Sequence, residues 1–240
     1  MTRKKLEQVM TREKLKTALS SVDWNANISE FVKETSLTGT IANCNLRLAI
    51  WSRQFEETDK GNPALPFIRE MQIAGHHTAA LTGLALYKPA AAAMRTLLET
   101  TLFYTYFRCH PCELATLVRN EDYFVQKSDL LDYHKKHTPE FDDFGLVGKI
   151  NKWYRQVSSI VHGQIPGIWT GHESLAQTKH VSELLPVVVD AFQEGEEIVH
   201  QLFLCTVGRD LWPGFSTDSK RKLLKGLPGE IKKALGLDAA

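Results

Sequence analysis

The sequence lacks any long apolar run. Its longest stretch without a formally charged residue, Met71–Tyr87, contains a glutamine, two histidines and two glycines, and is too polar for a membrane-spanning helix. The N-terminal segment, Met1–Lys16, mixes lysine, arginine and glutamate and has none of the apolar core that signal peptides require. These absences argue against a membrane partner and predict a cytoplasmic protein.

Cysteine and net charge are also scarce. The chain of 240 residues has four cysteines, and without a secretory signal we expect reduced thiols rather than a disulfide framework. Lysine and arginine total 29 against 28 acidic residues, so the formal net charge is only +1. No global positive field is therefore available to hold nucleic acid by counterion release. Any contact with nucleic acid must be local.

Strand-like patterning is a third absence. Apolar residues do not alternate with period two over any long segment, but they recur at helical spacing along most of the chain. Ser21 or Asp23 is available to cap the second of the predicted helices. The segments between 126 and 143 and between 163 and 179 are interpreted as surface loops. The predicted helices are Met1–Ser20, Trp24–Lys33, Ile41 to the polar stretch at Thr58, Phe67–Tyr87, Ala90–Phe107, Cys112–Phe124, Leu146–Val161 and Ser182–Val207.

This pattern predicts an all-α fold, a helical bundle with an extension at each end. The expected parts are an N-terminal helical extension over residues 1–40, the bundle over 41–210 and a C-terminal basic helical tail over 211–240. Lys220, Arg221, Lys222 and Lys225 make the tail locally basic. Contact with RNA and a merely solubilising role for these charges are both compatible with that pattern.

One polar stripe carries chemical interest. Arg155 and His162 are seven residues apart, so on a helix they fall within about 20° of each other, two turns apart. Ser158 and Ser159 lie between them on the same stripe. A solvated helix face is the ordinary explanation of such a stripe. The apolar residues of the segment point the opposite way: Ile150, Trp153, Val157, Ile160 and Val161.

Cleavage of RNA by transesterification is a reaction that this stripe has the groups to perform. A base must take the proton of the ribose 2′-hydroxyl, and a cation must stabilise the charge that builds on the phosphate. Neutral His162 suits the base, Arg155 offers a guanidinium fork for phosphate oxygens, and Ser158 or Ser159 would position the substrate. A second copy related by two-fold symmetry would supply the acid. The mechanism requires no metal ion and no cofactor.

The same residues resemble a known family. The segment Tyr154–Gly163, YRQVSSIVHG, resembles the R-x4-6-H signature of HEPN domains, and Ala93–Glu99, AMRTLLE, resembles the Arg-and-Glu helix of some HEPN-like branches. The resemblance covers roughly residues 41–207. It implies a dimerising helical bundle that cleaves RNA without metal, with Arg155 and His162 as the catalytic pair. It also implies toxin or phage-defence biology, with RNA, a second copy and an antitoxin or neighbouring defence protein as partners.

Arg95 and Glu99 allow two interpretations. They lie one helical turn apart, and an intrahelical ion pair is the commonest outcome of that spacing. If their helix faces the polar stripe, Glu99 would orient one of the stripe residues and Arg95 would add a phosphate contact.

Two rivals to a nuclease remain. One is a non-catalytic HEPN-like module that binds a protein or a nucleotide. The other is a zinc-stabilised helical regulator, because Cys109 and Cys112 have C-x2-C spacing and His134 and His137 follow in the sequence. No second cysteine pair is present to complete a four-cysteine site.

Overall fold

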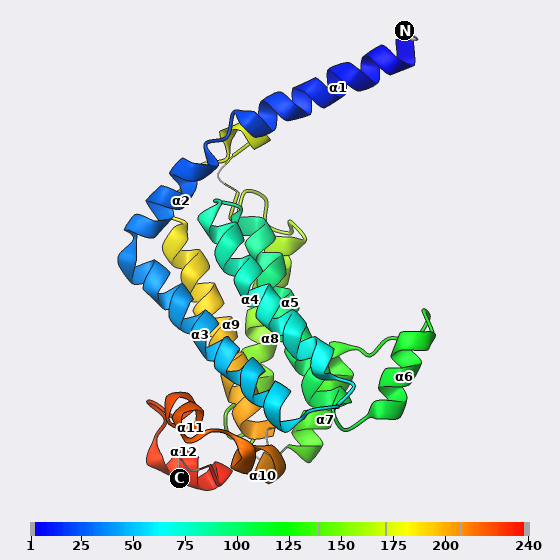
Figure 1. Cartoon of the computed structure of the whole chain (residues 1–240), viewed down its shortest axis with the longest axis vertical. Helices are drawn as coiled ribbons and strands as arrows, with labels where there is room; N and C mark the ends of the chain where they lie inside the picture. Colours follow the sequence, from blue (N-terminus) through cyan, green and yellow to red (C-terminus); the bar gives the residue numbers. More distant parts are fainter. Residues whose placement is uncertain (1–2, 139, 171, 207, 238–240) are drawn as a thin grey trace.

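The fold is an all-α bundle, as the apolar spacing predicts. A computed structural model describes residues 3–138, 140–170, 172–206 and 208–237, and no strand occurs within these ranges. Long helices pack side by side in the centre (Figure 1). They are α3 (Thr35–Thr58), α4 (Leu65–Gly83), α5 (Tyr87–Phe107), α8 (Leu146–Val161) and α9 (Leu185–Thr206). Helix α5 contacts α4, α8 and α9, so it forms the middle of the bundle.

The N-terminal region begins with a projecting helix. Helix α1 (Arg3–Ser20) extends away from the bundle, whereas α2 (Trp24–Lys33) lies against α3 and α4 (Figure 1). The predicted cap of α2 is confirmed, because the Asp23 carboxylate accepts a hydrogen bond from the N–H of Ala26 at 2.8 Å. The expected boundary at residue 40 falls inside α3, which is continuous from Thr35.

A close approach between α8 and α9 fixes the position of α8. The Trp153 side chain is buried, and its indole N–H donates a hydrogen bond to the carbonyl of Ala191 at 2.8 Å. The indole lies directly over Gly195, where a Cβ atom would come within 2.4 Å of Trp153 Cζ2. Only glycine leaves room for this packing. The contact therefore sets the angle at which α8 presents its opposite, polar face.

The helix pattern predicted from the sequence is wrong in several places. The segment interpreted as a charged loop contains helix α7 (Lys127–His137), which has a capping box between Gln126 and Asp129. Its buried residues are packed by α5, so tertiary contacts make this charge-rich segment helical. Helix α6 (Pro111–Arg119) ends earlier than predicted. The break between α4 and α5 comes before Tyr87, at Ala85, whose backbone is left-handed with φ of 60°. Tyr87 therefore begins α5 instead of ending α4, and Pro89 lies in the first turn of α5.

The C-terminal region is docked on the bundle. It consists of α10 (Gly208–Leu211), a 3-10 turn (Trp212–Gly214), α11 (Thr217–Leu223) and α12 (Gly229–Leu235). Trp212, Phe215 and Leu223 are buried, and the N–H of Ser216 donates to Gln54 Oε1 of α3 at 2.7 Å. Within the ranges given above, none of the helices combines the length and apolar character that crossing a lipid bilayer demands.

Candidate functional site between α5, α7 and α8

Helix α8 has the two faces that the sequence predicts. It spans Leu146–Val161, and the apolar residues Ile150, Trp153, Val157 and Ile160 are buried. Arg155 and His162 are exposed on the other side. The side chain of Arg155 makes no hydrogen bond or ion pair with the residues that the structure describes.

The end of α8 places His162. His162 is the C-cap residue, and Gly163 follows in the left-handed conformation with φ of 65°. The N–H groups of Gly163 and Gln164 donate to the carbonyls of Ile160 and Ser159, at 3.1 and 2.9 Å. This is a Schellman motif, which requires glycine at the position after the cap. The His-Gly pair therefore ends the helix and leaves the imidazole at its rim.

His162 meets Arg95 of α5. Arg95 Nη1 lies 2.9 Å from His162 Nε2. A guanidinium can only donate hydrogen bonds, so Nε2 is the acceptor and the neutral imidazole carries its proton on Nδ1. The structure thus joins two residues that are 67 positions apart in the sequence and favours the interpretation in which the Arg95 helix faces the polar stripe.

Glu99 and Tyr154 hold Arg95 in place. Glu99 Oε1 accepts hydrogen bonds from Arg95 Nε at 2.8 Å and from the Tyr154 hydroxyl at 2.6 Å. The Arg95 guanidinium also lies over the Tyr154 ring, 5.0 Å from its centroid. Burial, followed by the hydrogen bond to Glu99, raises the pKa of Tyr154 to about 12, so the phenol remains a donor. The ion pair suggested by sequence spacing is therefore one part of a longer network.

Lys127 is a functional candidate that sequence reasoning missed. It begins α7, in the segment interpreted as a loop, and its ammonium lies 4.8 Å from the Tyr154 ring centroid. It also donates to Asn151 of α8. Burial and the nearby charge of Arg155 lower the pKa of Lys127. Arg155 is therefore close enough to Lys127 to affect its pKa, although no hydrogen bond joins them.

The two serines differ in what they offer. Ser159 Oγ donates to the carbonyl of Gln156 at 2.7 Å, the usual backward bond of a helical serine. Ser158 Oγ is shielded from solvent and makes no hydrogen bond of normal geometry with a described residue, although its proximity lowers the pKa of Tyr154. Ser158 has a spare hydroxyl, at a cost of about 1 to 3 kcal/mol for an unsatisfied buried group, whereas that of Ser159 is already used, but the spare one is covered.

The site as a whole is a local concentration of positive charge. Arg95, Lys127 and Arg155 come from three helices, and Glu99 is the acidic residue bonded within this network. Such a cationic face suits phosphate groups, because one guanidinium can donate two parallel hydrogen bonds to two phosphate oxygens. In a chain with a net charge of +1, this face meets the requirement that any nucleic-acid contact be local.

The cysteine and histidine residues do not assemble a zinc site in the described ranges. Cys109 and Cys112 are exposed, but His134 is buried, and its two ring nitrogens lie 2.9 and 2.8 Å from the hydroxyls of Thr105 and Thr138. No group of three or more histidine, cysteine or acidic side chains lies close enough there to hold a metal ion.

Comparison of the chain with protein-family models, with curated proteins and with solved structures found no match. The resemblance to HEPN domains therefore rests on the motifs in α5 and α8.

Proposed function

We propose that the protein is a HEPN-type endoribonuclease that cleaves RNA by 2′-hydroxyl transesterification. Its site is the α5/α8 face, defined by Arg95, Tyr154, Arg155 and His162 together with Lys127 at the start of α7. The observation that carries the proposal is the 2.9 Å contact between Arg95 and His162, because it puts a phosphate-binding cation beside a group that can act as a base.

Phosphate binding would free the base. A phosphate that binds Arg95 and Arg155 accepts the hydrogen bond that Arg95 Nη1 otherwise gives to His162, and the Nε2 lone pair becomes available. Nε2 then takes the proton of the 2′-hydroxyl, and the resulting oxygen attacks phosphorus. The bond from phosphorus to the 5′-oxygen breaks, leaving a 2′,3′-cyclic phosphate and a 5′-hydroxyl.

The leaving 5′-oxygen needs a proton, and we assign that role to the protonated His162 of a second copy of the chain. Arg155 is exposed and bonded to nothing in the described part of the chain, so it is free to meet either the substrate or that copy. His162 of one copy is then the base and His162 of the other copy is the acid. The proposed reaction uses no metal ion.

The remaining residues position the reacting groups. Glu99 and Tyr154 fix the direction of the Arg95 guanidinium through hydrogen bonds of 2.8 and 2.6 Å. Lys127 adds positive charge beside the same ring. The Ser158 hydroxyl is unpaired but buried, so it would contact a ribose or phosphate oxygen only if substrate binding uncovers it.

The test is RNA cleavage in the presence of excess chelator. Purified full-length protein is incubated with a defined single-stranded RNA, and the ends of the products are analysed. We expect cyclic phosphate ends, with about a hundredfold or greater loss of rate in His162→Ala and Arg155→Ala. His137→Ala, an exposed histidine on α7, serves as the matched control. Equal rates in all variants, or complete dependence on added metal, would overturn the mechanism.

A non-catalytic binding or dimerisation module is the second candidate. It is favoured by the network from Tyr154 through Glu99 and Arg95 to His162, which ties α5 to α8 and occupies the Nε2 lone pair. A module of this kind forms no RNA products. In sedimentation, Arg155→Ala would weaken dimerisation without any change in RNA, which separates the two candidates.

A further inference from the structure

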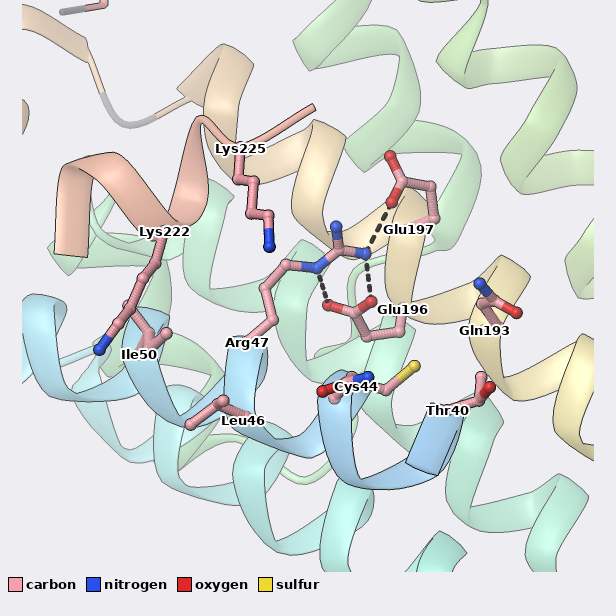
Figure 2. A pocket seen from close by; sticks show the side chains of 11 residues that line it. Thr40, Cys44, Leu46, Arg47, Ile50, Gln193, Glu196, Glu197, Lys222 and Lys225 are labelled. Carbon is pink, nitrogen blue, oxygen red and sulfur yellow. Dashed lines mark hydrogen bonds and ion pairs between the residues drawn. The ribbon is translucent and has the colours of Figure 1, made fainter. Parts of the chain in front are cut away.

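A cavity lies between the bundle and the C-terminal region, away from the α5/α8 face. This cavity has a volume of about 460 Å³ and is walled by α3, α9 and the end of α11 (Figure 2). Pockets for small organic molecules span about 300 to 1,000 Å³, so the space is large enough for one.

Arg47 forms the floor of the cavity and has donors to spare. Its Nε donates to Glu196 Oε1 at 2.7 Å, and its Nη2 donates to the other oxygen of Glu196 and, at 2.6 Å, to Glu197 (Figure 2). The carboxylate of Glu196 is fully buried, and its ion pair with Arg47 compensates for the loss of solvation of that negative charge. Nη1 has no partner among the described residues, and its two hydrogens remain available.

Lys225 supplies a second cation that faces the first. Figure 2 shows its ammonium pointing toward the Arg47 guanidinium. No ion pair of Lys225 occurs in the described part of the chain. By contrast, Lys222 extends away from the guanidinium and pairs with Asp218 at 2.7 Å. Two like charges that face each other across a cavity repel, and an anion between them would relieve that repulsion.

The surroundings restrict the kind of anion. Glu196 and Glu197 lie beside Arg47 and would repel a doubly charged anion more strongly than a singly charged one, so a singly charged group fits better than a doubly charged phosphate. Leu46, 56% exposed, lines the cavity beside Ile50 and offers an apolar wall. Burial raises the pKa of the neighbouring Cys44 to about 12, so this thiol stays protonated and takes no part as a nucleophile.

We propose that this cavity reversibly binds a small organic monocarboxylate with an apolar body. The carboxylate lies between Arg47 Nη1 and Lys225 Nζ, and the apolar body covers Leu46 and Ile50. The ligand would bridge α3 and the C-terminal region, so its binding would stabilise the docked position of α11. This inference is independent of the nuclease proposal.

Benzoate is a suitable probe, with benzamide as its uncharged counterpart and inorganic phosphate as the doubly charged one. Titration calorimetry on the full chain should detect benzoate but neither of the other two compounds. We expect Lys225→Gln to weaken benzoate binding at least tenfold and Lys222→Gln to change it less than twofold. Both lysines are exposed, so both variants should fold, which circular dichroism checks.

Four results would overturn the proposal. Three are comparisons of affinity: equal affinity for benzoate and benzamide, tighter binding of phosphate than of benzoate, and unchanged benzoate affinity in Lys225→Gln. Absence of any benzoate signal at millimolar concentration has the same consequence. Arg47→Ala is a poor test, because it leaves the buried Glu196 carboxylate without a partner and would destabilise the fold.

Discussion

The packing of Trp153 on Gly195 allows a quantitative test of how α8 is held. In Gly195→Ala the new methyl group would lie 2.4 Å from Cζ2 and 2.8 Å from Cε2 of the indole, well inside van der Waals contact. Trp153 is 1% exposed, so it has no free space into which to move, and the neighbouring core must shift with it.

The magnitude follows from three effects. Overpacking of a dense core costs about 1 to 3 kcal/mol. If the indole N–H loses the carbonyl of Ala191, a buried donor is left unsatisfied at about 1 to 3 kcal/mol. Alanine regains up to about 1 kcal/mol of helix propensity over glycine. We therefore expect Gly195→Ala to lower the free energy of unfolding by about 3 kcal/mol.

Urea denaturation monitored by circular dichroism measures this difference. Gly148→Ala is the matched control, because Gly148 also lies within a helix but a Cβ there meets nothing within 4 Å. We expect the control to be as stable as the unchanged protein or to gain up to about 1 kcal/mol. If Gly195→Ala is equally stable, Trp153 does not anchor α8 against α9, and the account of how the α5/α8 face is positioned fails.

Two further predictions concern buried groups. Burial lowers the pKa of His134 from 6.5 to about 4, so its contribution to stability is present above pH 6.5 and is lost as the pH falls toward 4. We expect up to about 3 kcal/mol of acid destabilisation from this residue, and an imidazole NMR signal that does not move between pH 7.5 and 5.5; titration in that range would contradict the burial. A chromogenic disulfide reagent should modify the exposed Cys109 and Cys112 quickly in the folded protein, whereas the buried Cys44 and Cys205 should react only on unfolding. Four equally fast thiols would refute this assignment.

Part of the site could be predicted from the sequence, because it depends on local chemistry. The faces of α8 follow from residue spacing, and its end follows from the His-Gly pair, because glycine satisfies the left-handed position after the cap. Asp23 caps α2 for an equally local reason. These features depend on atoms within a few residues of each other, so the sequence by itself determined them.

Tertiary structure decided which of these residues meet. The bonds from Glu99 to Tyr154 and from Arg95 to His162 span 55 and 67 positions, and they exist because α5 and α8 pack together. Helix α7 was not predicted because its segment is rich in charge and its few apolar residues belong to the core only through their contact with α5. Lys127, its first residue, was missed for the same reason. The distance along the chain between interacting groups is the physical reason: local spacing fixes a side chain's direction, but only packing between helices brings it a partner.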